Sequence, residues 1–503
     1  MTSDRPSPTG GRSGSLGVLR GHLRPGAPAA RAESDAALAA QTILSTLGIL
    51  VQGGVRFVFS VLVGNAFGKL VLGAANAAIS LALFASLVHP SAAAQTATKF
   101  VARARGARDF EGAAAATAHL ARWTAVSSVA LGVVGALVAP ALLGLGAVES
   151  ALTGALVVAY SGYMFTRGVL FGAGCVQRAT VWDLISSAIS LAALAAVVVA
   201  GETAWILLPL VLGYAVYVGA NLPRRSRATV PADLRREMNG FLGLTLVNSV
   251  ATGGFLQLSM VAAQHWDPEG AGAFAAALTL ATPASLASRS LSLVLLPSLA
   301  TAYGRGDHDS VRRQTDISTR VLAVVSLATF GPLMLLSPTL ISLFFRRDGF
   351  DEAVILLPIL LAAVMVLNVV IGATNSLLTR EQRHARVVVA ASVVGALAGA
   401  AWWLVAAPTG GVHAVAVGYL GGTLIVSVIP VVVAWRLDHH AWAGLVARFV
   451  GMTAVAGALV WWEESTGASL LVQLLLAVGF VVCWLGISWK DARLTVQMLR
   501  HSR

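Results

Sequence analysis

Four cationic side chains stand inside otherwise apolar stretches of the sequence, and they are the residues best suited to hold a ligand. They are Arg56, His89, Arg167 and Arg289. A charged group at the centre of a membrane helix costs about 2.5–3.5 kcal/mol on the insertion scale, so such groups commonly mark a functional site. Guanidinium groups bind phosphate oxygens through paired, charge-assisted hydrogen bonds. The pattern therefore predicts a cavity that binds an anionic molecule.

Each cation also has a structural interpretation. Arg56 and Arg289 lie far enough from the middle of their stretches to extend toward lipid headgroups. Arg167 can instead bridge two helices. His89, which precedes Pro90, fits either a buried hydrogen-bonded residue or a contact to cargo or a proton.

Asn76 and Gln257 add uncharged polar groups to the apolar stretches. Their amides can bind sugar hydroxyls, and hydrogen bonds between neighbouring helices explain them equally well. The set of expected substrate-binding residues is therefore Arg56, Arg289, Arg167, His89, Asn76 and Gln257.

Acidic residues follow the opposite pattern. None of the 23 is expected at the middle of a span; Asp183 lies near the edge of the fifth, and Glu463 with Glu464 is expected in a solvated turn. The sequence contains no glycine-rich phosphate loop, metal-ligand spacing or Ser/His/Asp arrangement. We therefore expect no enzyme activity, metal ion or cofactor.

The elements that must position these residues are membrane helices. Hydrophobic residues make up 57% of the chain and charged residues 12%, against about 25% charged in soluble domains. Runs of about 20 apolar residues predict about fourteen spans and an all-α polytopic membrane protein. The expected spans are 41–63, 72–95, 121–143, 150–174, 181–200, 203–222, 240–264, 270–299, 321–345, 353–378, 386–407, 412–435, 446–463 and 468–489.

Arginine clusters alternate with nearly neutral connections along the chain. This bias places both termini in the cytoplasm, as an even number of spans requires; Arg346 and Arg347 alone contradict it. Residues 1–40 are expected to form a disordered basic tail and 490–503 a second cytoplasmic tail. Because the net charge of +12 is spread over short loops, we expect membrane lipids as partners and no nucleic acid.

Three local matches at a spacing near 200 residues indicate an internal repeat. Gly53-Gly54 resembles Gly253-Gly254, RGARD at 105–109 resembles RGDHD at 305–309, and LGY at 212–214 resembles VGY at 417–419. The matched segments lie on the same predicted side, so the repeat is parallel. We expect one six-helix lobe over 41–222, a second over 240–436, and two further helices over 446–489.

Three stretches resemble the multidrug/oligosaccharidyl-lipid/polysaccharide (MOP) exporter superfamily, in its polysaccharide-transporter and lipid-linked oligosaccharide flippase branch. They are GGVRF through GNAFG (53–68), LLPSL followed by GRGD (295–307), and NSLLTRE (375–381). Lipid II flippases of this superfamily place arginines of spans one and eight around a central cavity, and Arg56 and Arg289 occupy the matching spans.

The resemblance implies a flippase of the bacterial plasma membrane. It would move a polyprenyl-phosphate-linked oligosaccharide or polysaccharide precursor by alternating access and work beside cell-envelope glycan synthesis enzymes. The alternative within the superfamily is a cation-coupled multidrug antiporter, which would need an embedded carboxylate in span one or seven. A polytopic glycosyltransferase or polymerase would need catalytic carboxylates or large external loops, and a membrane scaffold would need further soluble domains.

Overall fold

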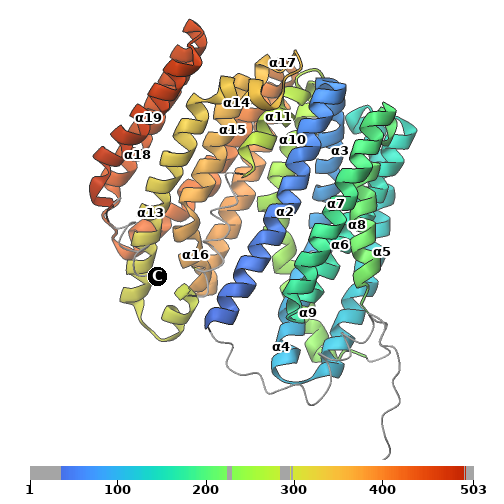
Figure 1. Cartoon of the computed structure of the whole chain (residues 1–503). Coiled ribbons are helices and arrows are strands. Elements are labelled where there is room, and N and C mark those ends of the chain that lie inside the picture. The colour runs from blue at the N-terminus through green and yellow to red at the C-terminus, as the bar shows by residue number, and fades with distance from the viewer. Residues whose placement is uncertain (1–34, 224–228, 284–294, 296–297, 492, 494–503) are drawn as a thin grey trace, which may run out of the picture.

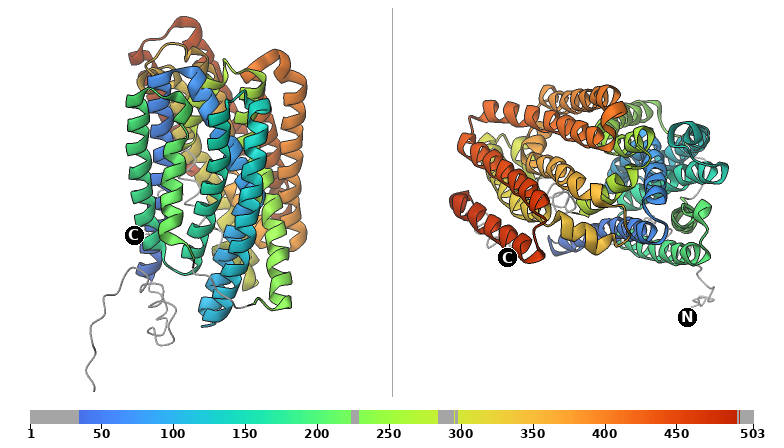
Figure 2. Two further views of the ribbon diagram at one scale, coloured as in Figure 1. Left: turned by 90° about the vertical axis from the view of Figure 1, so that its right-hand side faces the viewer. Right: turned by 90° about the horizontal axis from the view of Figure 1, so that it is seen from above.

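A computed structural model describes residues 35–223, 229–283, 295, 298–491 and 493. Throughout this part the ordered elements are helices, and ten of them are long and apolar enough to cross a membrane. The chain is therefore an all-α polytopic membrane protein, as the sequence predicts. Its helices run roughly along one common axis (Figures 1 and 2).

The first part of the chain supplies helices α2 to α8. Their bounds are α2 (Asp35–Phe67), α3 (Lys69–Val88), α4 (Pro90–Gly106), α5 (Phe110–Leu143), α6 (Ala147–Gly172), α7 (Val176–Ala200) and α8 (Leu208–Asn221), with a 3-10 turn η1 (Thr203–Trp205) before α8. Helices α5, α4 and α8 pack on α6, and α2 packs on α7.

The second part supplies the remaining helices. They are α9 (Ala232–Ser249), the π-helical turn η2 (Val250–Gly254), α10 (Phe255–Trp266), α11 (Ala271–Ala281), α13 (His308–Leu335), α14 (Ser337–Phe344), α15 (Asp351–Val369), α16 (Ile371–Thr379), α17 (Gln382–Asp438), α18 (Ala443–Thr466) and α19 (Leu470–Ile487). Seen along the bundle, the two parts lie side by side, with α18 and α19 at one edge (Figure 2).

Several predicted spans consist of more than one helical segment. The second is broken at His89, where Pro90 starts α4 because proline cannot donate the preceding helical hydrogen bond. The eleventh and twelfth belong to α17, whose backbone turns at Gly411 with φ +52°. Any side chain at Gly411 would meet the carboxylate of Asp267, which accepts a hydrogen bond from the Val412 amide at 3.2 Å. Of the eighth span, α11 covers the first half and much of the rest lies outside the described residues.

The helices approach closely where small residues face each other. A methyl group at Gly154 of α6 would lie 2.6 Å from the Gly132 carbonyl oxygen of α5. Gly73 of α3 and Gly272 of α11 join the two parts in the same way, since a methyl group at Gly73 would lie 2.8 Å from the Gly272 nitrogen. Association of helices in lipid depends on such contacts because lipid chains are as apolar as the side chains.

The repeated arginine loops adopt equivalent structures. Asp109 caps α5 by accepting a hydrogen bond from the Gly112 amide at 2.8 Å, and Asp307 caps α13 through Ser310 at 2.9 Å. The residue before each aspartate, Arg108 or Gly306, has a positive φ. The structural match therefore pairs Asp109 with Asp307, two residues away from the sequence match. The boundaries of the two lobes stay a prediction.

The last two helices are fastened by ion pairs at the end of the bundle that carries the arginine loops, here called the basic end. Asp491 binds Arg320 of α13 at 2.8 Å and Arg448 of α18 at 2.7 Å. The start of α2 and the end of α19 both lie toward this end (Figure 1). The predicted tail residues 1–34 and 494–503 lie outside the described residues, and α2 already begins at Asp35.

The small-residue contact gives a stability prediction. Gly154→Val should lower the free energy of unfolding by about 1–3 kcal/mol, because the added carbons would collide with the α5 backbone. Thermal unfolding in detergent measures the effect. Gly457→Val is the matched control, since Gly457 is exposed within α18 with no atom within 4 Å of the added group. Equal melting temperatures for the two variants would contradict the packing argument.

Candidate substrate-binding site

Arg56 is a half-buried cation inside α2. Among the described residues it forms no ion pair or side-chain hydrogen bond, and it interacts electrostatically with the hydroxyl of Tyr214 on α8. A guanidinium in this setting keeps its donors available. Arg56 therefore has the properties of an anion ligand.

Arg167 has a different environment because a carboxylate neutralises it. Its Nε donates to Asp183 Oδ2 at 3.1 Å, and its guanidinium lies over the Phe171 ring at 4.5 Å. The hydroxyl of Tyr163 donates to the other oxygen of Asp183 at 2.9 Å. This ion pair joins α6 to α7 inside the helix bundle, which favours the bridging interpretation. A ligand role for Arg167 stays a prediction that rests on Nη2, which has no hydrogen-bond partner among the described residues.

Two carboxylates are more buried than the sequence indicates. Asp183 is completely buried, because α7 begins at Val176, ahead of the predicted span. The expectation of a solvated turn at Glu463 and Glu464 is wrong for Glu463. Helix α18 continues to Thr466, and its 100° step per residue buries Glu463 to 3% exposure while Glu464 stays exposed.

Tyrosines connect the surroundings of Arg56 and Arg167. The ring centroids of Tyr163 and Tyr214 are 4.9 Å apart, and Tyr217 packs on Tyr163 at 4.8 Å. Arg56 interacts electrostatically with Tyr214, and Arg167 with Tyr163 and Tyr217, so both arginines border one aromatic cluster. Nothing in the sequence groups these tyrosines, because they come from α6 and α8.

His89 lies at the break between α3 and α4. Its Nδ1 is 2.8 Å from the Ser127 hydroxyl of α5, and its side chain is half-buried. This contact fits the structural interpretation of a histidine that joins two helices. A role in cargo binding or proton transfer stays a prediction.

The two predicted amides differ in their contacts. Asn76 accepts a hydrogen bond from Ser60 of α2 at 3.2 Å and donates to the Leu72 carbonyl at 3.1 Å. Gln257 is half-buried in α10, and no hydrogen bond of its side chain occurs within the described part of the chain. Arg289 lies outside the described residues. The structure therefore groups Arg56 with Arg167 through the tyrosines, and joins Asn76 to α2.

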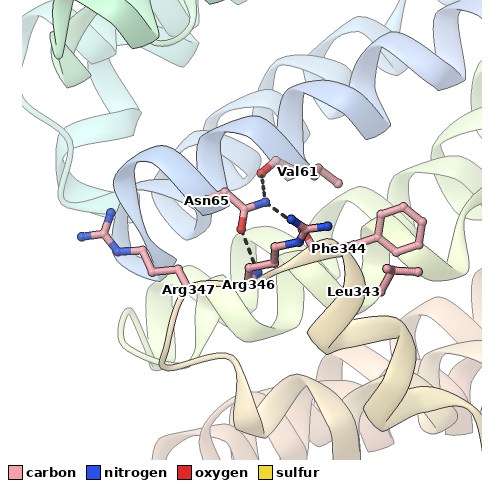
Figure 3. A pocket seen from close by; sticks show the side chains of 6 residues that line it. All are labelled: Val61, Asn65, Leu343, Phe344, Arg346 and Arg347. Carbon is pink, nitrogen blue, oxygen red and sulfur yellow. Dashed lines mark hydrogen bonds between the residues drawn. The ribbon is translucent and has the colours of Figure 1, made fainter. Parts of the chain in front are cut away.

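The two parts of the chain meet at the end of the bundle opposite the basic end, in a contact that the sequence did not predict (Figure 3). Asn65 of α2 donates to the Phe344 carbonyl at 2.7 Å and accepts from the Arg346 amide at 2.8 Å. Arg347 donates to the Ala66 carbonyl at 2.7 Å. We call this contact between Asn65-Ala66 and residues 344–347 the seam latch. Its signals in the sequence were Asn65 in the resembling motif and Arg346-Arg347, which contradict the charge bias.

Comparisons with known proteins agree with this architecture. Residues 156–482 match the family model described as lipid II flippase MurJ. A solved structure of lipid II flippase MurJ in an inward closed conformation has a TM-score of 0.65 at 13% identity and covers 90% of this chain and 99% of that one. An inward-facing multidrug resistance MATE family transporter has a TM-score of 0.62 at 15% identity, with coverages of 78% and 94%.

A MOP superfamily transporter from Pyrococcus furiosus is also similar, with a TM-score of 0.54 at 15% identity and coverages of 79% and 94%. Comparison with curated proteins gives no match. Identities this low show the shared fold alone. The match to the family model, which covers more than half of the chain, confirms the resemblance to the MOP superfamily.

The buried ion pair gives a test that separates structure from ligand binding. Asp183→Leu should destabilise the protein by about 3–5 kcal/mol, because Arg167 would remain as an uncompensated buried charge. The double variant Arg167→Met with Asp183→Leu should recover most of this loss in a denaturation experiment. Transport by the folded double variant at the wild-type rate would remove Arg167 from the substrate site.

Proposed function

The chain belongs to the lipid II flippase MurJ family, and from this membership we propose that it moves a polyprenyl-phosphate-linked saccharide precursor of the cell wall across the bacterial plasma membrane. It is a membrane transporter of the MOP superfamily. The proposed steps are binding at the cytoplasmic side, rearrangement of the two lobes, and release at the outer side. No covalent step is needed.

The observation that carries the proposal is the guanidinium of Arg56 within a membrane helix, which has no ion-pair partner in the described part of the chain. Such a charge is costly in lipid unless an anion or water meets it. A phosphate or pyrophosphate group would offset this cost through charge-assisted hydrogen bonds. We propose that Arg56 and Arg289 bind the phosphates, that Asn76 and Gln257 contact the sugar, and that His89 and Arg167 contribute at the edges of the cavity.

The positive-inside rule supports a cytoplasmic location for the basic end and for both termini. The seam latch then lies at the outer side, where its hydrogen bonds close the contact between α2 and the segment after α14. Release outside would require these bonds to break. Cell-envelope glycan synthesis enzymes are the proposed partners, since they make and consume such a cargo.

The alternative is a cation-coupled multidrug antiporter, which the likeness to MATE transporters keeps within the same fold. That activity would need an available carboxylate in the first or seventh span. Residues 50–67 and 255–266 contain no Asp or Glu. Asp183 is already paired with Arg167. These facts favour an anionic cargo.

Arg56→Ala should abolish transport, because the cavity would lose its uncompensated positive charge. Arg56→Lys should retain a reduced rate, since an ammonium keeps the charge and loses the bidentate geometry. The measurement is the amount of lipid-linked saccharide that accumulates on the inner leaflet after depletion of the wild-type protein. Arg289→Ala should have the same effect.

Arg383→Gln is the matched control, because Arg383 is an exposed arginine of the basic end paired only with Glu381 among the described residues. It should transport normally. Altered drug sensitivity without any accumulated saccharide would support the antiporter. Normal transport by the Arg56 and Arg289 variants at normal expression would contradict the proposed cavity.

Asn65→Leu should favour opening at the outer side, because two hydrogen bonds across the seam latch are lost. At about 0.5–1.5 kcal/mol per bond, the shift amounts to about 1–3 kcal/mol. Spin labels at Val148 and Leu470, two exposed positions at the same end of the bundle, report the opening as a longer distance. An unchanged distance distribution would show that the latch does not hold the closed state.

A further inference from the structure

A hollow of about 540 Å³ lies beside the seam latch. It is lined by Val61 and Asn65 of α2, by Leu343 and Phe344 at the end of α14, and by Arg346 and Arg347, which follow α14 (Figure 3). Below the latch its wall is apolar, and the Phe344 ring packs edge-on against Phe57 at 5.1 Å. The hollow thus combines two cations with an apolar surface.

Arg346 brings a free charge to this hollow. Its backbone amide is held by Asn65, whereas its exposed side chain forms no ion pair or hydrogen bond with any described residue. Arg347 extends to the other side of Asn65 (Figure 3) and donates to Ala66. A second neighbouring charge is Lys69, whose side chain lies along Gly349. An arginine at this end runs against the positive-inside bias.

Carboxylates near the hollow do not cancel this charge. Asp351 and Glu352 occupy the first turn of α15, where they stabilise the positive end of the helix dipole. Asp348 is exposed and forms no ion pair with a described residue. None of these three residues lines the hollow. An anion that enters it would meet guanidinium, amide and apolar groups.

We infer that this hollow is an exit site on the outer leaflet. In it, Arg346 binds a phosphate of the translocated lipid-linked saccharide, and the isoprenoid chain of that lipid lies on Val61, Leu343 and Phe344. A phosphate on an isoprenoid chain matches a cation above an apolar wall. The occupant of the hollow is the cargo, because the site is built on the seam latch, where the proposed rearrangement would release the cargo. This inference rests on the proposed function.

Binding of undecaprenyl pyrophosphate to the full-length protein in phosphatidylcholine nanodiscs tests the inference, with native mass spectrometry as the readout. The background is the double variant Arg56→Ala with Arg289→Ala, which removes both proposed phosphate ligands of the central cavity. One probe molecule should remain bound, and adding Arg346→Gln should weaken it about tenfold, as expected for loss of one charge-assisted contact. The substitution keeps the backbone bond to Asn65, so the seam latch stays intact.

Arg305→Gln is the control, because Arg305 lines a second hollow at the basic end, with Ser298 and Gln314. It should leave binding unchanged, and a tenfold excess of phosphatidylglycerol should not displace the probe. Affinity within twofold of the background after Arg346→Gln would overturn the exit site. Displacement by phosphatidylglycerol would overturn the cargo as its occupant. Both results are independent of transport by Arg56 variants, which tests the proposed function.

Discussion

The arrangement of this protein depends on the cost of holding a charge inside a membrane. Arg167 and Asp183 meet that cost within the chain, as a guanidinium and a carboxylate 3.1 Å apart with a tyrosine hydroxyl on the second oxygen. Arg56 borders the same aromatic cluster through Tyr214 and has no such partner among the described residues. The same residue type thus stabilises the helix bundle at one position and is available to an anion at the other.

Hydropathy predicted the helices well because each span must satisfy its backbone hydrogen bonds internally, which a long apolar helix does. The break at Pro90 and the turn before Val412 also follow from local sequence. The partners of buried charges do not, because they come from different helices. The sequence therefore identified Arg167 but not its ion pair with Asp183. It also predicted Glu463 in solvent, because the predicted span ended at residue 463 whereas α18 continues to Thr466.

The repeat shows a second limit of sequence reasoning. Alignment of the two loops by residue identity pairs Gly106 with Gly306. The helix caps and the positive φ angles instead pair Arg108 with Gly306. Backbone geometry is the property that both loops share, and different residues satisfy it. Arg346 is the converse case, since its conflict with the charge bias was visible in the sequence and its contact with α2 was not.

Helix α2 connects these observations, because both parts of the chain hold it. Toward the basic end, Gln52 donates to Ser187 of α7, and Gly48 lies against the Arg167–Asp183 pair, where a methyl group would be 2.7 Å from the carboxylate. At the other end, Asn65 is bound to the last residue of α14 and to the Arg346 amide that follows it. Arg56 lies between these two attachments. A rotation of the two parts about each other must break one of these two attachments. Breaking the seam latch exposes fewer buried charges than breaking the contacts beside the Arg167–Asp183 ion pair. The alternation proposed for this transporter therefore opens at Asn65 while α2 stays with α7 and carries Arg56 with it.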